Sequence, residues 1–431
     1  MNAFLSLLRE NRNYRYTWIG QVVSEVGDHF NNIAVFSLAV AGTKSGLVVS
    51  GVMLSRAIPA MVVGPAAGVV LDRLNRKYVM IASDLIRAVI ALLFILTIGR
   101  HDTWLLYLLS ALLMGASPFF TSGRTAILPS IATKEELHTA NALTQTTQWT
   151  TLVIGAFLGG TSAGLFGYTW AFIANSLSFL VSAACISRLF LPGRGFRPQR
   201  RAFTEAEVVR PWHEYMEGLR FMRGIPLIMG LLMINIGWAT GGGAAQILFT
   251  MFGEVVFKRG PAGLGEIWGS AGVGLVLGGI LAHSLSPRLN FVNYKRAIVI
   301  CYIVHGGAYV LFSQMRNFYW ALVFMALSRA GVAVSSVLNI EKLLRIVPDG
   351  LRGRVFATMD STTWSVMMLS LTGAGIASGY WDPRTIGAAA GILSSMTAIF
   401  WGWAHWTGRL TEPEWLGVEP REIEVHGEPT R

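Results

Sequence analysis

The chain contains little cysteine and little charge for its length. Two of its 431 residues are cysteine, Cys185 and Cys301, and both lie inside apolar stretches. Their positions give no metal-binding motif, so we expect no metal and no other cofactor, and we interpret both as small buried hydrophobic residues. Charged residues make up 14% of the chain, whereas soluble domains average about 25%. This deficit argues against an ordinary soluble globular protein.

Sequence motifs of enzymes and of ATP-driven pumps are also missing. Neither the phosphate-loop pattern GxxxxGK[ST] nor the zinc-protease pattern HExxH occurs in the sequence. We therefore expect neither an enzyme nor a pump that hydrolyses ATP. Arg9, Arg12 and Arg15 precede the first apolar stretch, and no small-residue cleavage pattern follows it, so we expect no cleavable signal peptide.

Long apolar stretches, by contrast, are abundant, and hydrophobic residues make up 53% of the chain. A helix of roughly 20 apolar residues crosses the ~30 Å hydrocarbon core of a bilayer. Only helices and closed barrels satisfy their own backbone hydrogen bonds in lipid. The sequence therefore predicts an all-α membrane protein with twelve transmembrane helices. We place the spans near residues 16–42, 46–71, 78–99, 103–124, 140–163, 167–190, 226–252, 264–286, 294–313, 318–338, 354–379 and 385–407.

The spans fall into two sets of six, which predicts two six-helix bundles. The expected parts are a first bundle at 1–190, a linker at 191–224, a second bundle at 225–408 and a polar cytoplasmic tail at 409–431. Apolar residues at helical spacing in the linker predict an amphipathic helix that lies in the membrane interface. These residues are Trp212, Tyr215, Met216, Leu219, Phe221 and Met222.

The positive charges are distributed unequally between the two sides of the membrane. Most of the 35 Lys and Arg residues lie in the terminal segments, the linker and the loops on the same side. The loops on the other side hold only Lys44, Arg100, Lys258, Arg259, Arg316 and Arg384. Because cytoplasmic loops carry the excess of Lys and Arg, both termini are predicted to be cytoplasmic. Topology thus explains the net charge of +11, and we expect no nucleic-acid partner.

The loop between the second and third spans carries a distinctive motif. It reads Gly68-Val-Val-Leu-Asp72-Arg73-Leu-Asn-Arg76-Lys77, and it resembles the loop signature of the major facilitator superfamily over a chain of matching organisation. The resemblance implies that Asp72 contacts the N-terminus of span eleven, where negative charge is favoured, and latches the cytoplasmic side shut. Gly68 would allow the close helix approach that this contact needs. Alternatively, the three basic residues only determine topology.

Three further segments narrow the resemblance to one branch of the superfamily. Residues 18–28, 56–59 and 84–88 are similar to macrolide-efflux and enterobactin-export proteins. This similarity implies a multi-pass protein of the bacterial plasma (inner) membrane that exports an amphipathic molecule in exchange for protons. The glycines at 155, 159 and 160 partly match the exporter signature of span five, without its proline.

Ionisable residues inside the predicted spans are candidate functional residues, because a charge at mid-membrane costs at least about 2.5–3.5 kcal/mol. Glu25, Asp28 and His29 lie on span one, and Arg56 lies on span two at a depth similar to that of Asp28. We interpret these four as candidates for proton coupling, in which a carboxylate alternates between a protonated and an arginine-paired form. The alternative is a permanent ion pair between the two spans.

Three more charged positions lie deeper in the chain. Asp84 and Arg87 are three residues apart on span three, which predicts a local ion pair. Arg329, in the middle of span ten, has no acidic neighbour in its own helix. Since the resemblance places span ten on the central cavity, Arg329 is predicted to bind either an anionic group of the substrate or a carboxylate of the first half.

Asp360 on span eleven lies near the predicted latch. It either takes part in gating or pairs with Arg352 or Arg354. Aromatic and amide residues at helical spacing are candidates for the substrate cavity, although such stripes also serve helix packing and interfacial belts. The candidates are Gln145, Gln148, Trp149, Asn175, Asn235, Trp238 and Gln246.

These patterns together predict a secondary active transporter that works by rocker-switch alternating access. The two sets of six spans form an internal repeat, which is typical of such carriers. The leading hypothesis is proton-coupled export of an amphipathic drug- or siderophore-like molecule. The alternatives are a uniporter or importer of a lipid-like or metal-chelate substrate and, less favoured, a channel or a sensor. The expected partners are a small-molecule substrate, protons and the lipid bilayer, and we expect a monomer.

Overall fold

The computed structural model describes residues 2–100, 103–191, 195–197 and 211–411. Within these ranges the chain has fourteen α-helices, three short helices of other types and no β-strand. The α-helices are α1 (Asn2–Glu10), α2 (Arg12–Ala41), α3 (Gly46–Arg73), α4 (Arg76–Leu93), α5 (Trp104–Ile131), α6 (Lys134–Phe166), α7 (Tyr168–Ser187), α8 (Pro211–Arg223), α9 (Pro226–Met251), α10 (Gly260–Leu285), α11 (Phe291–Gln314), α12 (Phe318–Ile346), α13 (Asp349–Ala377) and α14 (Pro383–Trp406). The short helices are η1 (Phe94–Thr97), the π-helix η3 (Phe252–Val256) and η4 (Ser286–Arg288).

Ten of these helices are long and apolar enough to cross a membrane, namely α3 to α7, α9 to α12 and α14. Each of the ten overlaps a range that the sequence predicts as a span, and α5, α6 and α12 extend furthest beyond the predicted bounds. The helices α2 and α13 have comparable lengths of 30 and 29 residues, but they fall outside this group because they carry more polar and charged side chains. The structure thus confirms an all-helical membrane protein with ten candidate spans.

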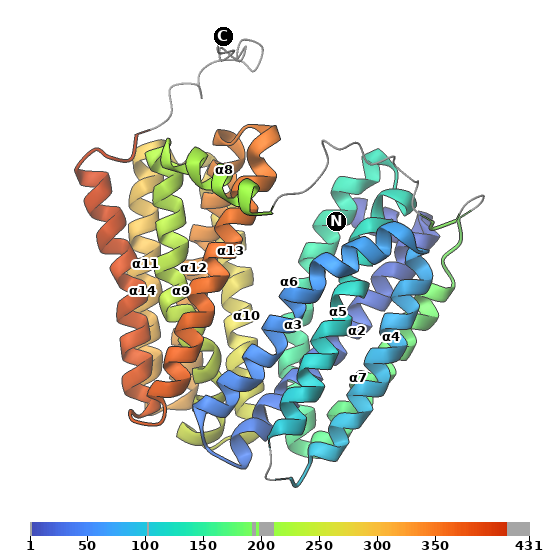
Figure 1. Ribbon diagram of the computed structural model, residues 1–431. Helices are drawn as coiled ribbons and strands as arrows, with labels where there is room; N and C mark the ends of the chain where they lie inside the picture. The colour runs from blue at the N-terminus through green and yellow to red at the C-terminus, as the bar shows by residue number, and fades with distance from the viewer. Residues whose placement is uncertain (1, 101–102, 192–194, 198–210, 412–431) are drawn as a thin grey trace.

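The helices form two bundles (Figure 1). Helices α2 to α7 make the first bundle and α9 to α14 the second, and α8 lies beside the second bundle at one end of the molecule. The two bundles are close together at the end opposite to α8, and their helices diverge towards the α8 end (Figure 1). Residues 192–194 and 198–210 of the predicted linker and 412–431 of the predicted tail lie outside the described residues.

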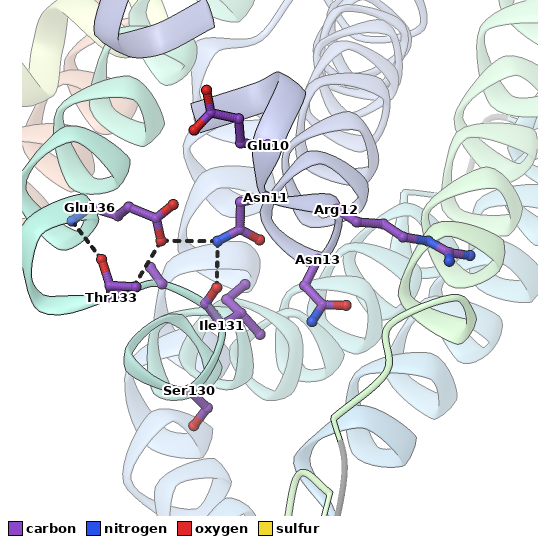
Figure 2. A pocket seen from close by; sticks show the side chains of 9 residues that line it. Glu10, Asn11, Arg12, Asn13, Ser130, Ile131, Thr133 and Glu136 are labelled. Carbon is purple, nitrogen blue, oxygen red and sulfur yellow. Dashed lines mark hydrogen bonds between the residues drawn. The ribbon is translucent and has the colours of Figure 1, made fainter. Parts of the chain in front are cut away.

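The short helix α1, which the sequence analysis did not predict, joins α2 at Asn11 (Figure 2). The Asn11 side chain caps α2 by accepting a hydrogen bond from the Tyr14 backbone N–H, and it donates to the Ile131 carbonyl at 2.6 Å and to Glu136 at 3.1 Å. Thr133 and Glu136 form a capping box at the start of α6. Since these polar groups already bond to one another, we do not assign a function to the cavity of about 420 Å³ that they border.

Glycines bring the two bundles into backbone contact at the closed end. A Cβ atom at Gly160 on α6 would lie 2.7 Å from the Cα of Gly265 on α10, and one at Gly265 would lie 2.5 Å from the Ala156 carbonyl oxygen. Helices α3 and α13 also approach closely, since a Cβ at Gly375 would lie 2.6 Å from the side-chain Cβ of Ser50. Small residues allow this close approach, which drives helix association in lipid through van der Waals contact.

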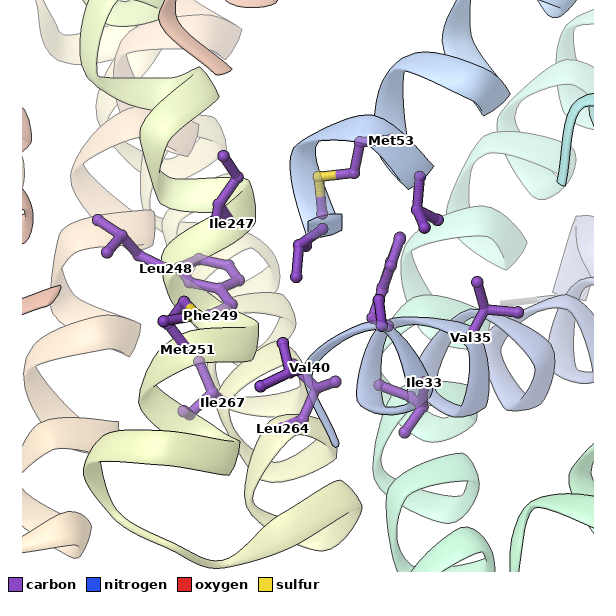
Figure 3. Packing of buried hydrophobic residues seen from close by; sticks show 14 of the residues in the cluster. Ile33, Val35, Val40, Met53, Ile247, Leu248, Phe249, Met251, Leu264 and Ile267 are labelled. Atoms are coloured by element: carbon purple, nitrogen blue, oxygen red, sulfur yellow. The ribbon is translucent and has the colours of Figure 1, made fainter. Parts of the chain in front are cut away.

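Buried apolar side chains from both bundles pack together at the same end (Figure 3). Val40 on α2 and Met53 on α3 belong to one cluster with Phe249 on α9 and Leu264 on α10, and all four are less than 9% exposed. Because the cluster joins residues from both bundles, it forms a continuous apolar layer between them.

Residues 211–223 of the linker form the helix α8, which rests on α13, and its position in the membrane interface stays a prediction. The hydroxyl groups of Tyr215 and Thr362 lie 3.2 Å apart, and Arg354 donates to Glu217 at 2.8 Å. A Cβ at Gly218 would lie 2.5 Å from the Thr358 hydroxyl oxygen, so α8 and α13 are in close contact. The linker helix is therefore attached to the second bundle through α13.

Candidate functional site

Each bundle contains a cavity that is bordered by equivalent helices. A cavity of about 250 Å³ lies between α2, α5 and α6, and one of about 440 Å³ lies between α9, α12 and α13. These are the first, fourth and fifth long helices of their bundles. At the closed end α6 packs on α10 of the other bundle and α13 packs on α3. Helices α6 and α13 thus each border a cavity and also contact the other bundle.

The first cavity has mostly polar walls, and the second has mostly apolar and aromatic walls. The first is lined by Tyr14, Thr17, Trp18, Gln21, Arg124, Thr125, Leu128, Asn141, Thr144, Gln145 and Gln148. The second is lined by Leu231, Asn235, Trp238, Gln246, Ser336, Asn339, Ile340, Leu343, Phe356, Met359, Asp360, Thr363, Trp364 and Met367. Five of the predicted cavity residues line one of these two cavities, namely Gln145, Gln148, Asn235, Trp238 and Gln246.

The other predicted cavity residues lie elsewhere. Asn175 is fully buried where α2 packs on α7, and a Cβ at Gly27 would lie 2.9 Å from its side-chain oxygen. Trp149 is 39% exposed and borders neither cavity. Arg329 also borders neither cavity, and its guanidinium group lies over the Phe249 ring at 5.1 Å from the ring centroid.

Glu25 is the centre of a polar cluster that joins three helices beside the first cavity. Its carboxylate forms an ion pair with Arg124 on α5 at 3.2 Å. The Thr151 hydroxyl on α6 donates to the second carboxylate oxygen at 2.8 Å, and the Gln21 amide donates to the first at 2.9 Å. The side chains of Glu25 and Arg124 are only 20% and 12% exposed, so this pair is largely shielded from solvent.

Asp28 and Arg56 do not form the ion pair that the sequence analysis considered. Arg56 instead donates to the side-chain oxygen of Asn32, and its guanidinium group lies 5.8 Å from the centroid of the Phe36 ring. Among the described residues no ion pair connects Asp28 to Arg56. His29 packs against α6, where a Cβ at Gly155 would lie 2.8 Å from the His29 ring.

The local pair between Asp84 and Arg87 is confirmed. Arg87 donates to Asp84, and the two residues are 2% and 0% exposed respectively. The guanidinium group of Arg87 also lies between the rings of Phe120 and Phe179, at 4.6 and 4.3 Å from their centroids. Cation–π contacts of this kind stabilise a buried guanidinium group.

The loop that carries the predicted latch makes no hydrogen bond or ion pair with α13 among the described residues. Asp72 is 62% exposed at its side chain and lies 3.7 Å from Arg76, and a Cβ at Gly68 would touch nothing within 4 Å. Arg76 donates to the Ala126 carbonyl at 2.8 Å, and Lys77 donates to two carbonyl groups at the end of α7. Arg73, like Asp72, is exposed. The bonds of this loop thus join it to the first bundle and, through the Arg76 backbone N–H and the Phe196 carbonyl at 3.2 Å, to the linker.

Comparison with known families identifies the chain. The family model described as Major Facilitator Superfamily matches residues 17–372. The chain belongs to the major facilitator superfamily. It is therefore a membrane-embedded transporter of small molecules rather than an enzyme.

Several bacterial transporters of the superfamily are similar along most of their length. The uncharacterised MFS-type transporter YfiS of Bacillus subtilis is 25% identical over 379 residues, which cover 86% of this chain and 88% of the relative. BacE of Bacillus subtilis, proposed to export bacilysin, is 25% identical and covers 81% of this chain and 84% of its own length. Macrolide efflux protein A of Streptococcus pyogenes is 23% identical, with coverage of 82% and 85%. The resemblance to the macrolide-efflux branch is thus confirmed.

Solved structures give the same fold. A bacterial homologue of the iron transporter ferroportin, crystallised in an inward-facing state, superposes with a TM-score of 0.66 over 90% of this chain and 98% of its own. Its sequence identity is 18%, so this similarity concerns the fold alone. In the described part of this major facilitator chain, no group of three His, Cys, Asp or Glu residues is placed to hold a metal ion.

Three residues of the Glu25 cluster were not among the predicted site residues of this transporter, namely Gln21, Arg124 and Thr151. The predicted fourth span ended near 124, at Arg124, whereas α5 continues to Ile131. In this last part of α5 the hydroxyl groups of Thr121 and Thr125 donate to backbone carbonyl groups four residues earlier in the helix. Thr151 on α6 could not be identified because its partner Glu25 is 126 residues away in sequence.

Proposed function

We propose that this chain is a secondary active transporter that exports an amphipathic small molecule by alternating access. The observation that carries this proposal is the asymmetric contact between the bundles. They are joined by glycine contacts and an apolar layer at one end, while equivalent helices of each bundle border a cavity. Rocking one bundle against the other about such an interface would expose the cavities to each side of the membrane in turn.

The proposed topology has twelve spans, with α2 and α13 completing two bundles of six at 1–190 and 225–408. Their lengths of 30 and 29 residues support this, since about 20 residues suffice to span the core. The charge asymmetry of the loops supports a cytoplasmic position for the α8 end and for both termini, in the bacterial plasma membrane. The structure would then represent an inward-facing state of a transporter that functions as a monomer.

Proton coupling is proposed to depend on the carboxylates of α2. Glu25 is bonded by side chains from α5 and α6, and both helices border the first cavity. Protonation of Glu25 would break its ion pair with Arg124 and so alter the contacts between these helices. Asp28, His29 and Arg56 are proposed to contribute to the same charged region. Asp72, with Gly68 and its basic neighbours, is proposed to bind the N-terminus of α13 when the α8 end closes.

Transport by inside-out membrane vesicles tests this proposal. Vesicles that contain the chain should accumulate erythromycin or tetraphenylphosphonium when a proton gradient is imposed, and a protonophore should abolish the accumulation. Vesicles from cells that lack the chain provide the baseline. Accumulation of both probes at the baseline level, or accumulation that a protonophore does not reduce, contradicts proton-coupled export of an amphipathic molecule.

A further inference from the structure

The larger cavity contains one carboxylate without a partner, in walls that are mostly apolar and aromatic and that also carry neutral polar side chains. Asp360 forms no hydrogen bond or ion pair with any other described residue, and it lies on the cavity wall formed by α13. The same face of α13 carries Phe356, Trp364 and Met367, at spacings of three and four residues. Opposite them, α9 contributes Trp238. An anionic group thus lies beside several aromatic rings and a thioether.

The basic residues nearest in sequence do not neutralise Asp360. Arg354 forms an ion pair with Glu217 of the linker helix, and Arg352 donates to the carbonyl groups of Val347 and Leu344. The two pairings that the sequence analysis offered for Asp360 are therefore absent. Its negative charge remains available to a ligand that enters the cavity.

The cavity also contains an unused hydrogen-bond donor. The indole N–H of Trp238 is buried and has no acceptor in the described part of the chain. A buried donor without a partner is energetically unfavourable, and a ligand with an acceptor group would satisfy it. The volume of about 440 Å³ is within the range of small-molecule sites.

We propose that this cavity is a binding site for an amphipathic organic cation, which places its positive charge on Asp360 and its apolar body against Trp238 and Trp364. Aromatic faces attract organic cations, and both Asp360 and Trp364 are exposed, the latter by 52%, so a ligand can reach them. This inference rests on the proposed transport function, because it names the class of molecule that would be transported. The first cavity does not fit this role, since its carboxylate neighbour Glu25 is already paired with Arg124.

Equilibrium binding to the purified full-length protein tests the inference with two ions of the same shape. Tetraphenylphosphonium and tetraphenylborate share four phenyl groups and have opposite charges. We expect the wild-type protein to bind the cation and to bind the anion much more weakly. Asp360→Asn should weaken binding of the cation about tenfold or more, while Asp360→Glu should retain most of it. Trp364→Leu should weaken binding more than Trp364→Phe.

Asp382→Asn provides the matched control, because it also removes one negative charge. Asp382 caps α14 at its N-terminus, away from both cavities, and asparagine preserves such a cap. Equal binding of the cation by Asp360→Asn and the wild type would overturn the inference. So would equal binding of the two ions by the wild type, or an equal loss in Asp382→Asn.

This binding measurement requires no transport, so it separates the two proposals. Charge-selective binding that depends on Asp360, in a protein that moves neither probe across vesicle membranes, would support the site and contradict the transport proposal. Proton-driven accumulation of erythromycin with unchanged cation binding in Asp360→Asn would do the opposite.

Discussion

Arg124 on α5 and Glu25 on α2 form an ion pair at 3.2 Å, and the two residues are 99 positions apart in sequence. Thr151 on α6 bonds to the second oxygen of the same carboxylate. Glu25 therefore connects the three helices that border the first cavity. Its protonation state and its contacts are linked, because a neutral carboxyl group loses the ionic part of both interactions.

Removing Arg124 should destabilise the first bundle. Arg124→Ala leaves a shielded carboxylate without its cation, which we expect to lower the free energy of unfolding by about 1–3 kcal/mol. Arg345→Ala is the matched control, because its pair with Glu341 is more exposed, with the Arg345 side chain at 62%. Such a surface pair contributes about 0–1 kcal/mol. Thermal unfolding in detergent measures both variants, and equal melting temperatures for the two would contradict this prediction.

The buried pair of Asp84 and Arg87 predicts a non-additive pair of mutations. Asp84→Asn should destabilise the protein by about 3–5 kcal/mol, because it leaves the buried charge of Arg87 without its counter-ion. The double variant Asp84→Asn, Arg87→Met should recover a large part of this loss, since it removes both charges. A double-mutant cycle of unfolding free energies checks this, and strictly additive losses would disprove the coupling.

Two glycines on α10 predict opposite tolerance to alanine. A Cβ at Gly265 would lie 2.5 Å from a carbonyl oxygen of α6, whereas one at Gly279 would meet no atom within 4 Å. Gly265→Ala should therefore cost about 1–3 kcal/mol through overpacking of the bundle interface. Gly279→Ala should leave stability within about 0.5 kcal/mol of the wild type. Similar melting temperatures for the two variants would show that this close contact does not form in the membrane protein.

The exposed position of Asp72 predicts that its mutation favours the state described here. Asp72→Asn removes only an exposed contact with Arg76 in this state, and such contacts contribute little. In the latched state it would remove a charge at a helix N-terminus, which contributes about 0.3–1 kcal/mol. The population with a separated α8 end should rise about two- to fivefold. Distances between labels at that end measure this change, and an unchanged distribution argues against the latch.

The sequence predicted those features that depend on local periodicity. The helix ranges and the linker helix followed from apolar spacing, and the pair of Asp84 and Arg87 followed from the turn of one helix. The partners of Glu25 and Arg56 depend on the rotation of packed helices about their axes, which apolar spacing does not define. Asp360 illustrates the same limit, because its position near the start of α13 suggested gating while the packing of three helices places it in a cavity wall.

Labelling both ends of the molecule tests alternating access most directly. The exposed residues Leu74 and Leu344 lie on different bundles at the α8 end, and Leu165 and Tyr380 lie on different bundles at the opposite end. Cysteines at each pair, in a chain whose two natural cysteines are replaced, allow distances to be measured by electron paramagnetic resonance in lipid nanodiscs.

We predict two populations of label-to-label distances at each end, in acidic and in alkaline buffer. The state with a short Leu74–Leu344 distance should be the state with a long Leu165–Tyr380 distance. A shortening at the α8 end with an unchanged distance at the opposite end, or one fixed distance at both ends in a protein that still transports, would contradict the account.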